Sequence, residues 1–474
     1  MELFYATDFQ FSAWLIRHAL GVLYLLAFVN AWNQFRPLCG EYGLLPAPLF
    51  LEQVSFRKTP SLFHRHYSDR FFGGVCGTGI LLSLSVISGI ALQGPVWISV
   101  AIWLLLWVLY QSIVNIGQLF YGFGWESMLL ELGFYAIFLG NAETAAPVAT
   151  IWMIRWMLFR VEFGAGLIKI RGDQCWRDLT CLNYHHETQP LPNPLSRFFH
   201  LQPEWIHKAE TFFNHTVQLV IIWGIFLPQP ISTFCALIVM GSQFYLIVSG
   251  NYSWLNWMTL LLGFSCLPDS FYAFLFNYPL PYSLTMPAGY EILVYAILLL
   301  VIYLSYEPVK NLLSSGQLMN FSFNPLHLVN TYGAFGSVTK TRYEIIIEGT
   351  LDDLEDEEVE WKEYEFKGKP GHPKRRPPQI APYHLRLDWQ MWFAAMTSYT
   401  RNPWLVRLVR KLLDDDKATL KLLRYNPFHG NPPRFIRATL YHYRYATRKE
   451  QRETGQFWIR DYRGIYMPPV ANER

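Results

Sequence analysis

The chain has 474 residues, of which 52% are hydrophobic and only 16% are charged, whereas a soluble protein usually carries about 25% charged residues. The net charge of +3 is too small for a protein that holds nucleic acid through phosphate contacts, so we expect no nucleic-acid partner. The apolar residues are concentrated between positions 11 and 306, while residues 310–474 have the composition of a soluble domain. Membrane lipid is therefore the first expected partner.

Nine segments are candidates for membrane spans, because a helix needs about 20 mostly apolar residues to cross the hydrocarbon core. They are residues 11–32, 71–93, 96–116, 120–140, 147–168, 212–227, 231–249, 252–267 and 290–306. The segments that begin at Phe120, Phe212 and Tyr252 are short or interrupted, and are candidates for re-entrant or interfacial helices. We predict a polytopic α-helical membrane protein, with a multi-span domain over residues 1–309 and a soluble C-terminal domain over residues 310–474.

Two long polar loops, residues 33–70 and 169–210, connect these segments. If all nine segments cross, both loops and the C-terminal domain lie on one side of the membrane. Each loop contains five Lys or Arg residues, and the short loops of the opposite side contain none. The positive-inside rule would place this shared surface in the cytoplasm.

The C-terminal domain is predicted to be a β-rich α+β fold. Apolar and polar residues alternate in residues 342–348 and 358–367, which flank an acidic turn and predict a hairpin, and again in residues 435–445. Residues 403–413 form an amphipathic helical pattern. The aromatic stretch 383–395 is interpreted as domain core, with an interfacial helix or a partner-binding surface as alternatives.

Charged residues lie inside two of the predicted spans: Glu126 and Glu131 in the fourth, and Arg155, Arg160 and Glu162 in the fifth. An Arg or Asp at the centre of a span costs roughly 2.5–3.5 kcal/mol on insertion scales. These side chains must therefore face the interior of the bundle and find partners there. We favour structural ion pairs over an ion or substrate path.

The loop at residues 169–210 concentrates reactive side chains. Cys175 and Cys181 are disulfide candidates, because a pair six residues apart can close a small loop in an oxidising compartment. His185, His186 and Glu187 offer acid–base groups or metal ligands, but their spacing is neither that of a zinc ribbon nor that of a metalloprotease helix, so no metal is predicted. The candidates for a functional loop are Lys169, Arg171, Asp173, Trp176, Arg177, Asp178, His185, His186 and Glu187.

The sequence contains no recognisable catalytic apparatus. It has neither a glycine-rich loop that would cradle a phosphate nor the Gly-x-Ser-x-Gly elbow of a lipase nucleophile. We therefore predict no catalytic residue and no cofactor. Composition and motifs alone lead to a polytopic membrane protein with an ordered surface on one side.

Long motifs resemble the lipase maturation factor family. The first is FGAGLIKIRGDQCWRDLTC at residues 163–181, which continues through HETQPLPNP from residue 186. VSGNYSWLNW, NTYGAFGSV, YEFKGKPG and PYHLRLDWQMWFAA follow in the family's order, starting at residues 248, 330, 364 and 382. The resemblance covers most of the chain from residue 155 to residue 469.

This resemblance implies a chaperone-like factor of the endoplasmic reticulum membrane, or of the cytoplasmic membrane in a bacterium. The expected partner is an exported lipase client that is helped to fold, assemble and leave. The family's C-terminal region faces the lumen, and we prefer this orientation to the positive-inside one because an exported client is not reachable from the cytosol. The client-contact candidates are Tyr332, Phe335, Tyr383, Trp389, Trp392 and Phe393.

Two other interpretations stay open at this stage. The first is a membrane-embedded enzyme that acts on a lipid or quinone-like cofactor through Lys169, His185, His186 or Glu187, distantly similar to the membrane domain of vitamin K-dependent carboxylases. The second is a transporter built around Arg155 and its charged neighbours. The family resemblance also departs from its animal members at Gly368 and Pro378, where those members carry a cysteine pair, so no thiol chemistry is expected there.

Overall fold

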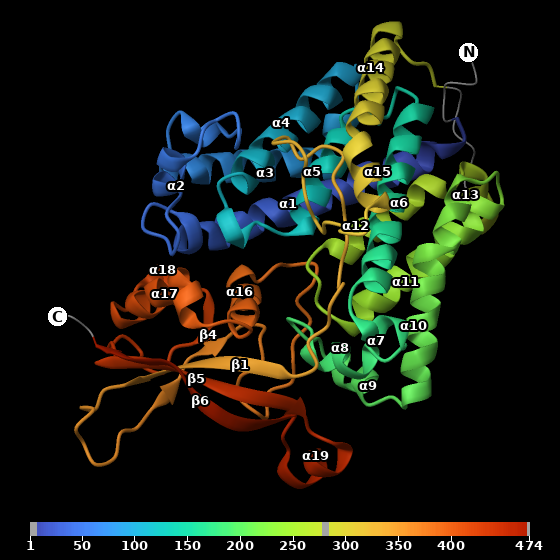
Figure 1. The fold of residues 1–474 in the computed structure, drawn as a ribbon. Helices are drawn as coiled ribbons and strands as arrows, with labels where there is room; N and C mark the ends of the chain where they lie inside the picture. Colours follow the sequence, from blue (N-terminus) through green and yellow to red (C-terminus); the bar gives the residue numbers. More distant parts are fainter. Residues whose placement is uncertain (1–6, 277–283, 472–474) are drawn as a thin grey trace.

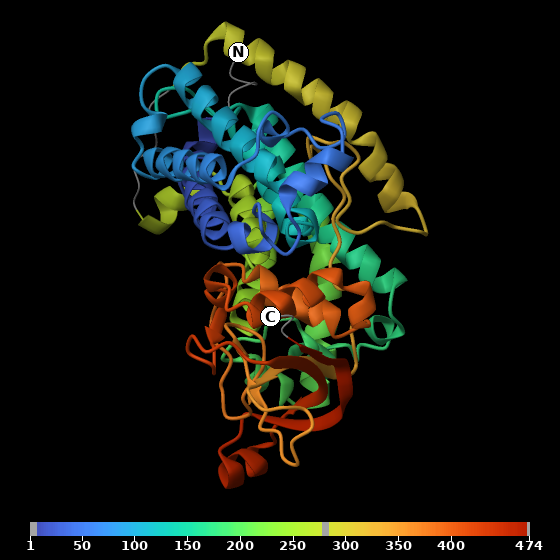
Figure 2. The same cartoon turned by 90° about the vertical axis from the view of Figure 1, so that its left-hand side faces the viewer.

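The computed structural model describes residues 7–276 and 284–471, and it has a helical region and a C-terminal region built on a β-sheet (Figure 1). The C-terminal region lies beneath the N-terminal helices both in this view and in the view turned by 90° (Figure 2), and the helices of residues 174–219 lie beside it in Figure 1. The two regions are joined by α15 (Tyr306–Leu313) and by an irregular linker that follows it. The predicted domain boundary between residues 309 and 310 falls within α15.

Within the described residues, five helices are long and apolar enough to cross a membrane. They are α1 (Gln10–Cys39), α3 (Asp69–Ile87), α4 (Val96–Val114), α11 (Ile231–Ser249) and α14 (Ala288–Leu304) together with its continuation α15. A sixth candidate is the pair formed by α12 (Leu255–Gly263) with its following turn and α13 (Asp269–Phe276), which is bent by 97°. The structure thus agrees with the predicted fold class: a bundle of apolar helices followed by a C-terminal region that contains a sheet.

The count of nine spans is not confirmed. Of the three short segments, the first is α5 (Gly124–Ala136), which has only 13 residues, and the last is the bent pair. The middle one is divided between the end of α10 (Glu204–Leu219) and a 3-10 turn. The fifth candidate, α6 (Val148–Arg171), has 24 residues but carries three charges near its middle, so it does not meet the composition of a lipid-facing span.

Five crossings lead to the same sidedness as nine. The loop at residues 33–70 follows the first crossing, the loop at residues 169–210 follows the third, and the C-terminal region follows the fifth. All three numbers are odd, so all three parts would lie on one side if these five helices cross the membrane. Counting the bent pair as a further span would move only the C-terminal region away, but that region contacts the loop at residues 169–210 directly.

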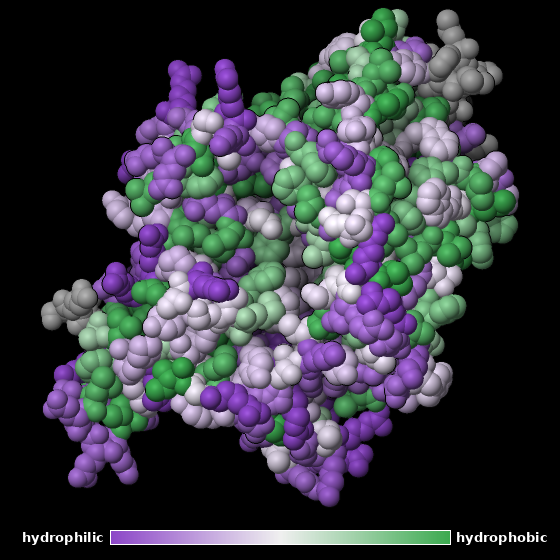
Figure 3. All heavy atoms as spheres, in the orientation of Figure 1, coloured by the Kyte–Doolittle hydropathy of each residue, from purple (hydrophilic) through white to green (hydrophobic). Residues whose placement is uncertain are grey.

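The outer surface of the helical region is apolar. Ile292, Leu299 and Tyr303 of α14 are 71%, 68% and 76% exposed, respectively. Figure 3 shows hydrophobic residues gathered over α14 and the neighbouring helices, and mostly hydrophilic residues over the C-terminal region. Because soluble monomers rarely expose large contiguous apolar patches, lipid must cover this part of the surface.

The C-terminal region is organised around a four-stranded antiparallel sheet in the order β2-β1-β5-β6. β1 (Arg342–Thr350) pairs along its whole length with β5 (Phe435–Tyr445), which confirms two of the predicted strands, and α17 (Pro403–Leu413) coincides with the predicted amphipathic helix. The other elements are β2 (Lys362–Glu363), β3 (Glu365–Phe366), β4 (Leu423–Tyr425), β6 (Trp458–Ala471), α16 (Arg386–Ala394), α18 (Lys417–Leu420) and α19 (Arg448–Thr454).

The predicted hairpin is observed only in part. β2 contributes two residues to the pairing with β1, and the chain then leaves this sheet so that β3 pairs with β4 in a second, two-stranded sheet. The aromatic stretch that contains α16 is largely buried, in agreement with its interpretation as core. β6 was not predicted from the sequence, although it is the longest strand and completes the main sheet.

A buried ion pair joins the helical region to the C-terminal region. Glu126 on α5 and Arg386 on α16 are both fully buried, and Oε1 of Glu126 lies 2.7 Å from a guanidinium nitrogen of Arg386. Tyr110 donates to the other carboxylate oxygen at 2.5 Å, and the guanidinium also donates to Asn30 Oδ1 at 2.9 Å. The guanidinium stacks 3.5 Å above the ring of Tyr121, so both charges have partners on several sides.

A second buried carboxylate, Glu131 on α5, is surrounded in the same way. It pairs with Arg160 of α6 and accepts hydrogen bonds from the backbone N–H of Asn330 at 2.8 Å and from the hydroxyl of Tyr332 at 2.8 Å. Asn330 and Tyr332 belong to the linker, not to the helices. The two glutamates of α5 therefore bind the chain that leaves the helical region as well as the helices beside them.

We predict that Arg386→Met lowers the free energy of unfolding of the full chain in detergent by about 3–5 kcal/mol, because it leaves the Glu126 carboxylate buried without its cation. The double variant Glu126→Gln/Arg386→Met, which removes both charges, should lower the free energy of unfolding by less than Arg386→Met alone. The matched control is Arg434→Met, whose ion pair with Asp353 is about half exposed and contributes about 1 kcal/mol or less. Equal unfolding midpoints for Arg386→Met and Arg434→Met would contradict this account.

Candidate functional site

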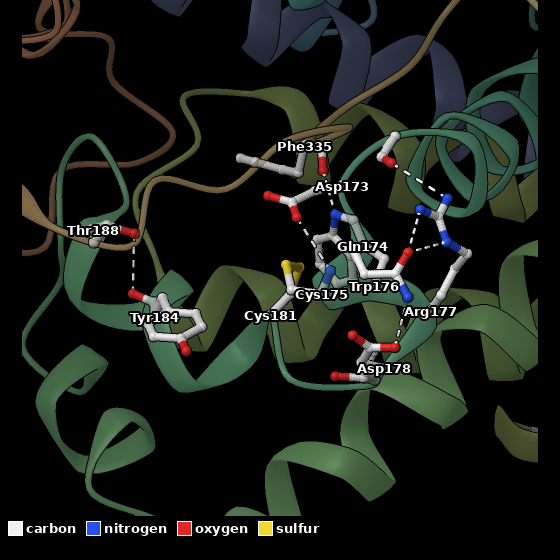
Figure 4. The surroundings of a disulfide bond; sticks show 12 residues. Asp173, Gln174, Cys175, Trp176, Arg177, Asp178, Cys181, Tyr184, Thr188 and Phe335 are labelled. Atoms are coloured by element: carbon white, nitrogen blue, oxygen red, sulfur yellow. Dashed lines mark hydrogen bonds between the residues drawn. A yellow bond between two sulfur atoms is a disulfide. The ribbon is translucent and has the colours of Figure 1, made fainter.

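The loop at residues 169–189 forms a compact turn closed by a disulfide bond between Cys175 and Cys181 (Figure 4). The turn begins after α6, where Asp173 caps the short helix α7 (Gln174–Arg177) by accepting a hydrogen bond from Cys175 N at 3.1 Å. α8 (Leu182–Thr188) follows immediately after Cys181. The disulfide thus links the first turn of α7 to the residue that precedes α8, as the cysteine spacing predicts.

The linker to the C-terminal region is bound to this turn. Trp176 donates from its indole nitrogen to Phe335 O at 2.7 Å, and Asp173 donates from its backbone nitrogen to Gly336 O at 2.8 Å. On the other side, His215 of α10 lies 3.0 Å from Trp176 O through its Nε2. The turn therefore connects α6, α10 and the linker, and these contacts give Asp173 and Trp176 a structural role.

The charged residues of the turn mostly bind nearby backbone. Arg171 donates to Leu312 O at 2.9 Å, and Arg177 donates to Ile170 O at 2.8 Å. Asp178 is exposed and accepts a hydrogen bond from within the same turn at 2.8 Å. These three candidates stabilise the turn, and whether they have a further function stays a prediction.

His185, His186 and Glu187 have three different environments on α8. His185 Nε2 lies 2.8 Å from the hydroxyl of Tyr252, which gives its single proton to Gln189 Oε1 at 2.7 Å. His185 Nε2 must therefore be the donor. Burial, assisted by the charge of Lys169, lowers the pKa of His185 to about 4, so this imidazole is neutral near pH 7.

Glu187 points toward the C-terminal region. Its Oε2 accepts a hydrogen bond from the backbone nitrogen of Tyr445 in β5 at 2.7 Å and lies 3.3 Å from His200 Nε2. Burial lowers the pKa of His200 to about 4, so its imidazole is neutral near pH 7. Glu187 thus helps to join α8 to the sheet.

A small cavity of about 150 Å³ lies beside α8, between α10 and α11. Lys169, His185 and His186 line it, and Phe335 of the linker closes one side. The ammonium of Lys169 donates to Asn214 Oδ1 at 2.7 Å and to a second amide oxygen at 2.8 Å. Trp176 also lines the cavity, so the structure brings four of the functional-loop candidates to one place.

The remaining intramembrane charges are also buried, but not all of them are paired with opposite charges. Arg155 donates to the backbone oxygens of Ser265 and Ile225 at 3.0 and 3.4 Å. Glu162 accepts hydrogen bonds from Gln218 and from Gln243, at 3.0 and 2.6 Å. These contacts give every intramembrane charge of the fourth and fifth predicted spans a polar partner, as expected for structural groups in a bundle.

The six client-contact candidates do not form one exposed surface. Tyr332 and Trp389 are buried, with exposures of 2% and 5%, because the first binds Glu131 and the second packs in the core. The other four are at least partly exposed. Phe335, Trp392 and Phe393 line a cavity of about 350 Å³ between the linker, the helices and α16.

Two arginines that hold this site together were not singled out from the sequence. Arg342, the first residue of β1, donates to Glu187 O, Gln189 O and Pro190 O at 2.9, 2.5 and 3.0 Å, and it pairs with Glu344. It anchors the loop at residues 169–210 to the sheet as Arg386 anchors the helical region. In the sequence, each looks like an ordinary charged residue of a soluble domain; Arg386 falls within the motif at residues 382–395, but nothing in the local sequence of either arginine indicates its partners.

Two protein-family models match the chain, one in the helical region and one in the C-terminal region. The lipase maturation factor transmembrane domain matches residues 11–274, and the lipase maturation factor C-terminal domain matches residues 328–468. The chain belongs to the lipase maturation factor family. The two glutamates of α5 and the disulfide-closed turn fall in the first family domain, and Arg342 and Arg386 fall in the second.

Relatives match along nearly the whole chain. Lipase maturation factor 1 of Mus musculus is 41% identical over 97% of this chain and 88% of its own length. The Homo sapiens protein of the same name is 39% identical with the same coverage. Lipase maturation factor 2 of Homo sapiens is 27% identical over 96% of this chain and 82% of its own length. No solved structure matches the chain significantly.

We predict that Cys175→Ser/Cys181→Ser lowers the free energy of unfolding by about 2 kcal/mol, the loop-closure contribution of a short disulfide loop. Peptide mapping of the unreduced wild-type protein should recover the two cysteines in one linked fragment. The control is Cys235→Ser, which removes a partly buried free thiol and should change stability much less. Recovery of both Cys175 and Cys181 as free thiols would contradict the assignment.

Proposed function

We propose that this chain is a membrane-bound maturation factor that assists the folding, assembly and export of lipases. One observation carries this proposal: relatives named Lipase maturation factor 1 match 97% of the chain at about 40% identity. The match includes both family domains, so the proposal concerns the whole chain and not a shared membrane anchor. The naming also favours a protein that is not an enzyme.

The mechanism that we propose is chaperone-like and uses the surface between the two regions. Phe393 in α16 and Met396 just after it are 41% and 45% exposed, and both line the cavity of about 350 Å³ together with Trp392. Exposed aromatic and methionine side chains around a concave site are suited to hold the apolar surface of another protein. A folding lipase subunit would bind here until its own partner covers that surface.

We further propose that the membrane domain comprises residues 1–309 and the soluble domain residues 310–474, and that the shared surface faces the lumen of the endoplasmic reticulum. In a bacterial cell the corresponding place is the outer side of the cytoplasmic membrane. The disulfide between Cys175 and Cys181 supports this orientation, because disulfides persist in oxidising compartments and are rare in the cytosol.

We predict that Phe393→Ala/Met396→Ala in the full chain weakens client binding about tenfold, since losing an apolar anchor costs about 1.4 kcal/mol or more. The measurements are co-precipitation of a dependent lipase and secreted lipase activity. The matched control is Tyr462→Ala/Ile465→Ala on β6, where the two side chains are 57% and 55% exposed outside the cavity. Undiminished lipase binding and secretion in the first variant would refute this client surface.

A membrane-embedded enzyme acting on a lipid or quinone-like cofactor is a second candidate, favoured by the cavity that Lys169 and His185 line. The same variants separate the two proposals. An enzyme acting at that cavity would keep its function in Phe393→Ala/Met396→Ala, whereas a client-binding factor would lose it.

A further inference from the structure

Three potential metal ligands converge where α8 meets α10, beside the cavity of about 150 Å³. His186 comes from α8, while His207 and Glu210 come from the first two turns of α10, on the same face of that helix because they are three residues apart. One ligand atom from each lies within 4.8 Å of the other two. The rings of the two histidines are 5.9 Å apart between their centres.

His186 is the group that points to a missing ligand. Its side chain is 1% exposed, and neither ring nitrogen has a hydrogen-bond partner among the described residues. A buried polar group without a partner is costly, and few native groups are left in this state.

His207 is oriented as a metal-binding histidine is. Its Nε2 lies 3.3 Å from the backbone oxygen of His200, and a carbonyl can only accept, so Nε2 carries the proton. The lone pair is then on Nδ1, which lies 3.5 Å from Oε2 of Glu210. A ligating histidine usually donates its other ring N–H to a carbonyl or carboxylate in this way, which fixes the tautomer and the direction of the lone pair.

We propose that His186, His207 and Glu210 bind a zinc ion. Two imidazoles and one carboxylate are an established ligand set for tetrahedral zinc, with the fourth position open. Because His186 and Glu210 also line the cavity, the open position faces it and takes water or a donor atom from a bound molecule. This site goes beyond lipase maturation, and the prediction from the sequence that no metal is bound would be overturned by it.

The site requires a small closure. Ligand atoms of a tetrahedral zinc site are about 3.3 Å apart, so the present separation of up to 4.8 Å must shorten by about 1.5 Å. Glu210 can supply this movement, since its side chain is 21% exposed, whereas that of His207 is only 3% exposed. The ion would join α8, which contacts the sheet, to α10 of the helical region.

The test is the zinc content of the full-length protein. Wild-type protein in detergent is equilibrated with zinc chloride, desalted and analysed by mass spectrometry of the elements, and we expect one zinc ion per chain. His186→Ala and Glu210→Gln should each lower the affinity for zinc by at least about 100-fold, the upper limit for partners outside the ligand shell. Cobalt in place of zinc should give the visible absorption of a tetrahedral site in wild type only.

The matched control is His64→Gln. His64 is a partly buried histidine of the loop at residues 33–70, and its Nε2 lies 2.8 Å from Thr59 O, so this variant should keep one zinc ion. Glu210→Gln keeps the size of a partly exposed side chain and is the decisive variant if His186→Ala does not fold. Wild-type protein without stoichiometric zinc, or Glu210→Gln that retains as much zinc as wild type, would overturn the proposal.

Discussion

Two buried carboxylates on one short helix organise the molecule. Glu126 and Glu131 of α5 are both inaccessible to solvent, and a carboxylate in such a place is stable only if it is paired and hydrogen-bonded. Glu126 takes its cation from α16 in the C-terminal region, and Glu131 takes Arg160 from α6 together with two linker residues. The helical region therefore needs the C-terminal region in place, because α16 and the linker supply partners for its two buried carboxylates.

This constraint explains how a single surface is assembled beside the membrane. With α16 and the linker held on α5, β1 is placed so that Arg342 reaches three backbone oxygens at the end of α8. The disulfide-closed turn is then bounded by α10, the linker and the sheet. The cavities that we associate with a client and with a metal ion both lie at these contacts, so each depends on the two regions staying together.

The parts of the fold that depend on local pattern were predictable from the sequence. Alternation in residues 342–350 and 435–445 and the amphipathic pattern of α17 gave the right elements, because each buries one face. β6 was missed because Gly464 and the prolines at 468 and 469 interrupt its alternation. The count of nine spans was not confirmed, because apolar stretches inside a bundle, such as α5 and α12, can be as apolar as lipid-facing helices although they are short.

Only the parts of the site that lie within a sequence motif could be predicted. The spacing of Cys175 and Cys181 indicated the disulfide, and the family motif indicated the loop around it. Glu126 and Arg386 are 260 residues apart, and no periodicity relates positions so distant. For the same reason the sequence could not tell that Tyr332 turns inward to a carboxylate while Phe393 stays exposed, or that His186 meets two residues of another helix.

The central claim is that the loop at residues 169–210 and the C-terminal region share the non-cytosolic side of the membrane. The most direct test is to measure from which side each of them can be labelled. Single cysteines at Arg177, Glu453 and Gln93, which are exposed positions, can be labelled with a membrane-impermeant maleimide in sealed vesicles, while the native free cysteines are buried or partly buried. The account predicts that Gln93→Cys reacts from the cytosolic side and that Arg177→Cys and Glu453→Cys react only after permeabilisation. Reaction of Arg177→Cys or Glu453→Cys in sealed vesicles would contradict it.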